Sequence, residues 1–86
     1  MPQLSGFYGI SAFVFYRDHE PPHFHAVYAG QEALFAIETL EVLRGGLPPR
    51  AGTLLLEWAM MHRPELRRAW REARGLLPIT SIEPLA

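Results

Sequence analysis

The chain contains no cysteine and no lysine, and it has no long apolar run. Without cysteine there can be neither a disulfide framework nor a thiolate metal site. No stretch approaches the ~20 apolar residues that a transmembrane helix needs, so we expect no membrane association. No basic segment precedes an apolar run at the start of the chain, which argues against a secretory signal. With 86 residues and 49% hydrophobic content, we expect one small cytoplasmic domain over residues 1–86.

The net charge of −1 is divided unevenly along the chain. Residues 1–43 hold five of the nine carboxylates and one arginine, whereas residues 44–86 hold four carboxylates and seven arginines. Such a division indicates either ion pairing between the two halves or a basic face for an anionic partner. For so small a domain we favour ion pairing between the halves.

The first half of the chain has the composition of β-strands. Residues 9–16 are rich in β-branched and aromatic side chains, which are typical of strands. Further strands are expected over residues 23–29 and 32–38, joined by a two-residue turn at Gly30-Gln31. A short segment at 41–44 adds a fourth strand before the Gly45-Gly46 break. The pattern therefore predicts an antiparallel meander of three or four strands.

The second half has the periodicity of two helices. Pro48 and Pro49 suit the first turn of a helix, where the missing N–H groups would be unpaired anyway. Apolar side chains then recur at helical spacing, and they include Trp58. Pro64 ends this helix near His62 and begins a second one, which buries Leu66, Ala69, Trp70 and Ala73 and ends at Gly75. The tail from residue 76 to 86 is expected to form a short edge strand or an extended arm.

These elements predict a two-layer α+β domain in which the meander packs on two C-terminal helices. Both tryptophans are expected to face the sheet. The first strand carries apolar residues on both faces, with Phe13 and Phe15 on one and Val14 and Tyr16 on the other. One layer of helices covers only one face, and exposed apolar patches usually mark an interface. We therefore expect a protein partner or a homodimer.

The most distinctive segment is D-H-E-P-P-H-F-H at residues 18–25. His23 and His25 point to the same side of a strand, which makes them a good start for a site for Zn²⁺ or another divalent metal. His19 or Asp18 is expected to supply a third ligand, and His62 could reach the site from the helical layer. The alternative is a metal-free turn, in which the imidazoles bond to the backbone and pack against Phe24 and Tyr28.

The same cluster also suits acid–base catalysis. Asp18 or Glu20 could orient one histidine while another moves a proton, as in small ribonucleases. With Arg50 at a phosphate, the cluster would form a minimal RNA-cleaving site. No serine or cysteine lies near the cluster, so acyl transfer is not expected.

The second predicted helix carries a row of arginines. Arg67, Arg71 and Arg74 share one face, which could contact phosphates or an acidic partner. The chain has no interleaved aromatic residues for base stacking and an acidic pI of about 6.4. Nucleic acid is therefore not the favoured partner.

Together, the D-H-E-P-P-H-F-H-A run, the L-P-P-R segment at 47–50 and the L-E-W segment at 56–58 resemble the bacterial family called domain of unknown function 4160. The family signature falls on Asp18, His19, Pro21, Pro22, His23, Phe24, His25, Pro48, Arg50, Glu57 and Trp58. The resemblance implies no established activity. It does imply a neighbouring gene for a second small protein, in an arrangement similar to toxin–antitoxin pairs.

Two functional hypotheses follow. The first is an interaction module that binds a small protein encoded nearby, or a second copy of itself, in a toxin–antitoxin-like system. The second is a small metal- or histidine-dependent hydrolase, acting on RNA or another phosphoester, with His19, His23, His25 and Asp18 as its candidate catalytic residues. The neighbouring gene that the resemblance implies, the uncovered sheet face and the absence of a complete catalytic constellation favour the first.

Overall fold

The computed structural model describes residues 2–86 and contains five strands followed by two helices. The elements are β1 (Gln3–Phe7), β2 (Ile10–Phe13), β3 (His23–Tyr28), β4 (Gln31–Ala36), β5 (Val42–Gly45), α1 (Pro49–Met61) and α2 (Arg63–Arg74). Within this part of the chain, neither helix is long and apolar enough to cross a membrane.

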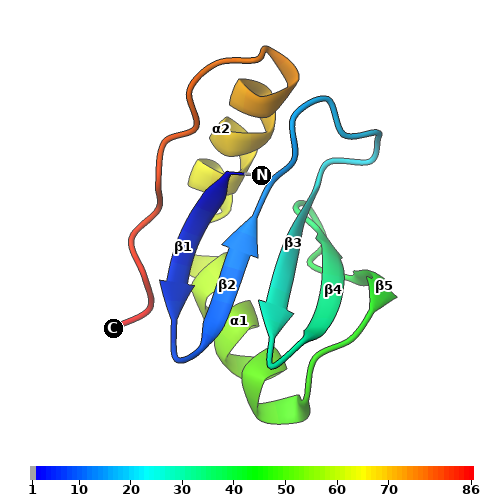
Figure 1. The fold of residues 1–86 in the computed structure, drawn as a ribbon, viewed down its shortest axis with the longest axis vertical. Coiled ribbons are helices and arrows are strands. Elements are labelled where there is room, and N and C mark those ends of the chain that lie inside the picture. Colours follow the sequence, from blue (N-terminus) through cyan, green and yellow to red (C-terminus); the bar gives the residue numbers. More distant parts are fainter. Residues whose placement is uncertain (1) are drawn as a thin grey trace.

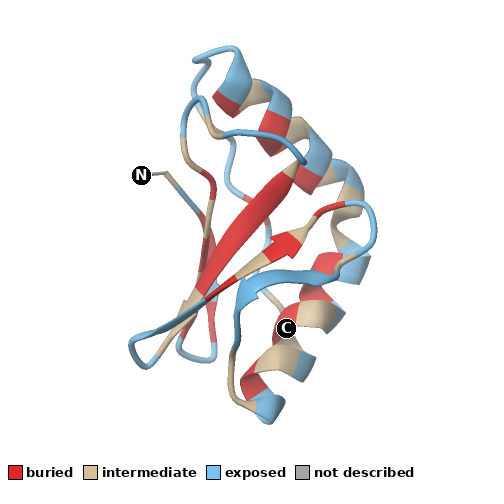
Figure 2. Ribbon diagram, turned by 90° about the vertical axis from the view of Figure 1, so that its right-hand side faces the viewer, coloured by how far each residue is buried: buried red, intermediate tan, exposed pale blue. Residues whose placement is uncertain are grey.

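The strands form one antiparallel sheet in the order β1-β2-β3-β4-β5, so that each strand pairs with its neighbour in sequence. Both helices lie on one side of this sheet (Figures 1 and 2). The predicted two-layer α+β meander is confirmed. The sheet has one strand more than expected, because β1 was not predicted. Its sequence, QLSGF, holds a serine and a glycine, which weaken the strand signal.

The hairpin between β3 and β4 turns one residue earlier than the sequence indicated. Tyr28 pairs with Gln31, so the two turn residues are Ala29 and Gly30 rather than Gly30 and Gln31. Both have positive φ, 49° and 80°, as a type I′ turn requires. Glycine takes up this conformation readily, so its place as the second turn residue fixes the register of the hairpin.

The core lies between the sheet and the helices, and it takes every second side chain of the central strands. Phe24 and Ala26 of β3 are fully buried there. The Phe24 ring meets the Trp58 ring of α1 edge to face at 6.0 Å. Trp58 is 0% exposed and Trp70 of α2 is 7% exposed, so the prediction that both tryptophans face the sheet is confirmed.

The helix boundaries follow the prolines. Pro49 begins α1, which ends at Met61, and Pro64 lies in the first turn of α2. Gly75 caps α2 with a φ of −88°, and the left-handed residue is the next one, Leu76, at 56°. The second helix therefore ends where expected, although glycine does not adopt the left-handed conformation there.

The C-terminal tail is the predicted extended arm rather than a strand. It runs beside β1, as the red and blue segments of Figure 1 show. The Ile82 N–H donates to the Leu4 carbonyl at 2.8 Å, and Trp58 Nε1–H donates to the Glu83 carbonyl at 2.7 Å. The arm therefore covers the β1 edge of the sheet and supplies the partner that a buried indole N–H needs.

Replacing Trp58 by alanine should lower the free energy of unfolding by about 3–5 kcal/mol, because it removes a fully buried aromatic side chain. Urea denaturation followed by circular dichroism measures this change. Trp58→Phe keeps most of the ring and should cost less than the alanine variant. A loss below about 1 kcal/mol for Trp58→Ala would contradict the central place of this side chain in the core.

Candidate metal centre

Two histidines of β3 face away from the core. Their neighbours Phe24 and Ala26 point toward the helices, so alternation puts His23 and His25 together on the other side of the strand. Both are nevertheless buried, at 3% and 6% exposed. The predicted shared orientation of the two imidazoles is confirmed.

Asp18 reaches both histidines from the turn between β2 and β3. Its Oδ2 atom lies 2.9 Å from His23 Nε2 and 3.1 Å from His25 Nε2. One candidate ligand atom from each of the three side chains lies within 4.8 Å of the others. Asp18, His23 and His25 are called the Asp-His-His cluster below.

Backbone hydrogen bonds hold the turn that carries Asp18. On one side of the aspartate, the Arg17 N–H donates to the Ala73 carbonyl of α2 at 3.4 Å. On the other side, the Pro22 carbonyl accepts from the Ile37 N–H at 3.0 Å. Proline rings at positions 21 and 22 restrict the backbone between these points. The carboxylate is therefore presented to the histidines by a turn anchored to both layers.

His19 and Glu20, two other candidates from the sequence, lie outside this cluster. The His19 side chain is 83% exposed, and its Nδ1 lies 3.1 Å from the other carboxylate oxygen of Asp18. Its ring centroid is 5.8 Å from that of His23, so it borders the cluster. Glu20 accepts a hydrogen bond from Arg74 at 2.8 Å instead of orienting a histidine. Of the two third ligands that the sequence left open, the structure brings Asp18 into the group.

The Nδ1 atom of each buried imidazole also has a hydrogen-bond partner. His23 Nδ1 lies 2.7 Å from the Pro21 carbonyl, and His25 Nδ1 lies 3.1 Å from Glu32 Oε2. The rings are also packed by aromatic neighbours. Trp70 lies 5.3 Å from His23, and Phe15 lies 4.0 Å from His25, between ring centroids. Hydrogen bonds and packing together fix the orientation of both imidazoles.

The contacts of His23 determine which of its nitrogens carries a proton. A carbonyl oxygen only accepts, so Nδ1 must donate its hydrogen to Pro21. In the neutral ring, Nε2 then presents a lone pair to Asp18 Oδ2. The two atoms are close enough for an ion pair, but the geometry of the contact does not fit a hydrogen bond. Nε2 has no other hydrogen-bond partner within residues 2–86. A lone pair and a carboxylate oxygen at this distance repel each other unless a proton or a cation lies between them.

The carboxyl group of Asp18 favours its ionised form. Burial works against the charge, but the hydrogen bonds from His25 and from the His19 backbone N–H, together with the positive charge that either imidazole carries when protonated, outweigh it. The pKa of Asp18 is therefore lower than its ordinary value of 3.8. An anionic oxygen is thus held between two imidazole nitrogens.

Glu32 is a part of the site that the sequence did not indicate. It lies at the start of β4, opposite Val27, on the same face as His25. His62, which was considered as a ligand from the helices, pairs with Glu65 at 2.8 Å and takes no part in the cluster. That hydrogen bond lowers the pKa of Glu65.

The candidate arginines are separate from the cluster, although one of them, Arg74, binds Glu20 of the same turn as Asp18. Arg67 forms two hydrogen bonds with Glu38, at 2.7 and 2.8 Å, and these lower the pKa of the glutamate. Arg71 is exposed on the same helix. Arg50 lies beside Tyr28, at the opposite end of β3 from His23. Two arginines of α2, Arg67 and Arg74, therefore pair with acidic residues of the first half, as the charge division indicated.

The fold and this cluster define a small α+β domain with a buried histidine–carboxylate site on the side of the sheet that faces away from the core. The chain belongs to the family described as domain of unknown function DUF4160, whose profile matches residues 9–71. This match confirms the resemblance noted in the sequence. Neither the curated proteins nor the solved structures gave a significant match.

In the metal-free protein, the ionisation of Asp18 should contribute measurably to the loss of stability at acid pH. Because the folded-state pKa is lowered, ionised Asp18 stabilises the fold above about pH 4, and this contribution is lost as pH falls through the folded pKa. The difference in unfolding free energy between wild type and Asp18→Asn should therefore be largest above about pH 5 and should shrink as the pH falls below the ordinary aspartate pKa of 3.8. Urea denaturation of both proteins in EDTA measures it.

His19→Ala is the matched control, since it keeps the carboxylate and should follow wild type across this range. A difference between wild type and Asp18→Asn that stays constant with pH would contradict the assigned charge state.

Proposed function

We propose that the Asp-His-His cluster binds one divalent first-row metal ion. The observation that carries the proposal is His23 Nε2, a buried atom without a hydrogen bond that faces the ionised Asp18 oxygen. A metal ion bound to both atoms supplies the positive charge that this contact requires. Two imidazoles and one carboxylate form a donor set typical of zinc and of other first-row divalent ions.

The distances suit this assignment. Atoms bonded to one ion at about 2.0–2.1 Å lie roughly 2.9–3.4 Å from each other at octahedral or tetrahedral angles. The two Nε2–Oδ2 distances of 2.9 and 3.1 Å fall in this range.

The hydrogen-bond partners of the two Nδ1 atoms also support a metal site. Metal-binding histidines usually donate their second ring N–H to a backbone carbonyl or a carboxylate. His23 has the Pro21 carbonyl and His25 has the Glu32 carboxylate in these positions. With these bonds made, each Nε2 has its lone pair directed to the ion.

Three protein ligands leave at least one coordination position for water or substrate, as in hydrolytic zinc sites. A bound ion would supply Lewis acidity and lower the pKa of a bound water molecule. His19 stands exposed at the rim of the cluster, where it could accept or deliver a proton. Hydrolysis is therefore the reaction class that this site supports best.

Metal analysis tests the proposal. After EDTA treatment and dialysis against Zn²⁺, wild type should retain about one ion per chain, and calorimetry should show saturable binding. His25→Gln and Asp18→Asn should each remove stoichiometric uptake, because each deletes one of three ligands. Affinity should also fall as the pH is lowered, since protons compete for imidazole.

His19→Ala provides the matched control, because this histidine adjoins the cluster without belonging to it. It should leave the bound zinc unchanged, and circular dichroism should show that all variants are folded. Equal zinc content in wild type and His25→Gln would overturn the proposal.

A second candidate function is protein binding through β5, and it is supported by the open edge of the sheet. All four β5 residues are exposed, including Val42 and Leu43 at 53% and 45%. The β1 edge is covered by the C-terminal arm, whereas β5 has no strand beyond it within residues 2–86. An exposed edge strand with apolar side chains is suited to pairing with another chain.

Size-exclusion chromatography with light scattering tests this candidate on the protein alone and together with its neighbouring gene product. A homodimer or a stable complex is expected. Leu43→Lys should dissociate it, because a charged side chain on an edge strand opposes pairing. The exposed Met60 of α1, changed to lysine, serves as a control that should leave association intact. A protein that stays monomeric and does not bind the neighbouring gene product would exclude this candidate.

A further inference from the structure

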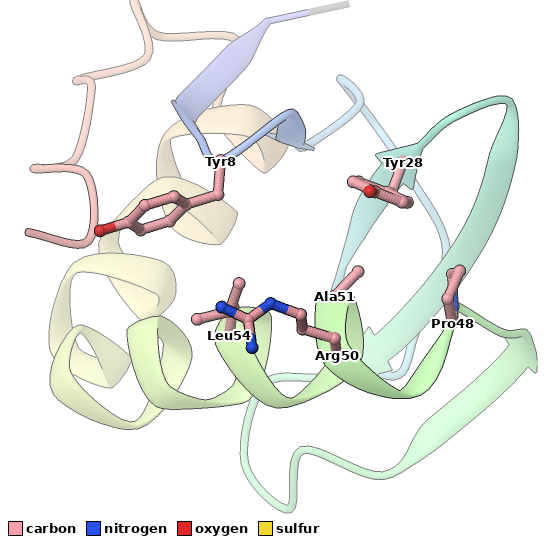
Figure 3. A pocket seen from close by; sticks show the side chains of 6 residues that line it. All are labelled: Tyr8, Tyr28, Pro48, Arg50, Ala51 and Leu54. Carbon is pink, nitrogen blue, oxygen red and sulfur yellow. The ribbon is translucent and has the colours of Figure 1, made fainter.

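A hollow of about 300 Å³ lies at the end of the sheet opposite the Asp-His-His cluster. It opens between the β1–β2 turn, the end of β3 and the beginning of α1. Figure 3 shows the six side chains that line it: Tyr8, Tyr28, Pro48, Arg50, Ala51 and Leu54. Its volume is at the lower end of the range for small-molecule sites, about 300–1,000 Å³.

Arg50 provides the only charge among the lining residues. It forms no ion pair within residues 2–86, whereas Arg67 and Arg74 each pair with a glutamate. Glu57 lines an adjoining hollow with Arg50 but forms no ion pair with it. The first turn of α1 holds no acidic residue and has no side-chain cap, so the helix dipole adds to the positive potential. The hollow therefore favours an anion.

Two aromatic rings stand on opposite sides of this hollow. Tyr8 lines it from the β1–β2 turn and Tyr28 from the end of β3, while Arg50, Ala51 and Leu54 approach from α1 (Figure 3). The Tyr8 hydroxyl donates to the Ala86 carbonyl at 2.9 Å, which holds its ring toward the C-terminal arm. Rings on both sides and apolar side chains below suit a flat apolar molecule.

The backbone of Tyr8 is unfavourable for this residue. Tyr8 and Gly9 form a type I′ turn with φ angles of 50° and 79°, where asparagine or glycine is preferred at the first position. The Tyr8 side chain is 58% exposed, so core burial does not compensate for the strained conformation. Such strain often accompanies functional sites.

We infer that this hollow binds a small organic anion, with its flat apolar body between the two tyrosines and its carboxylate or phosphate group on Arg50. A guanidinium forms strong charge-assisted hydrogen bonds with either group. This site is independent of the proposed metal centre, because Tyr28 and His23 are at opposite ends of β3.

Nuclear magnetic resonance titration of ¹⁵N-labelled protein tests the inference, with benzoate and phenyl phosphate as anionic probes. Saturable shifts are expected at Tyr8, Tyr28 and residues 50–54 with at least one of them. Whichever probe binds more tightly identifies the preferred anionic group. Benzamide has the same shape without the charge and should bind at least about tenfold more weakly.

Arg50→Gln should weaken binding of the anion at least about tenfold, since it removes the charge but keeps the size of the side chain. Arg44→Gln, on the exposed edge strand β5, should leave binding unchanged. Tyr8→Asn should raise the melting temperature, because asparagine suits the turn, while it weakens binding.

Three results would overturn the inference. One is the absence of saturable shifts with both anions up to about 20 mM. The second is equal binding of benzamide, and the third is unchanged affinity in Arg50→Gln. Metal removal should alter none of these measurements, so failure here is distinct from failure at the Asp-His-His cluster.

Discussion

The alternation of side chains along β3 is the constraint on which both the core and the site depend. One set, Phe24 and Ala26, is buried against the helices, and the other, His23 and His25, meets Asp18. A slip of one residue would put the imidazoles in the apolar core and phenylalanine at the carboxylate. The free energy gained by burying Phe24 therefore also fixes the position of the cluster.

The division of charge along the chain has a structural counterpart. Glu20 and Glu38 come from the acidic first half, and they meet Arg74 and Arg67 of α2. These pairs are exposed and add little stability, as is usual at protein surfaces. Glu20 lies in the turn that carries Asp18, so its pair with Arg74 joins this turn to α2, where Trp70 packs against His23. The helix thus contributes to the site through position and packing rather than through a ligand.

Much of the architecture could be predicted because it rests on local patterns. Prolines 49 and 64 mark the helix starts, and the His-x-His spacing gives the shared orientation of the imidazoles. Glu32 was missed because its place depends on hairpin register. Moving the turn by one residue shifts the pairing by two, and only the observed register puts Glu32 opposite Val27, diagonal to His25. Whether Asp18 or His19 joins the two buried histidines depends on the path of the turn, which no local pattern in the sequence determines.

The Asp-His-His cluster has two ways to balance its charges. Without a metal ion, His25 can satisfy both Asp18 and Glu32 only as an imidazolium, because both carboxylates accept hydrogen bonds. With a metal ion, neutral His25 would donate to Glu32 and would bind the ion through Nε2. His23 differs from His25. A proton on His23 Nε2 would not be directed at Asp18, so it would remain without a hydrogen bond. A proton on Nε2 therefore forms a hydrogen bond in only one of the two histidines, whereas a metal ion bound by the three side chains would contact both.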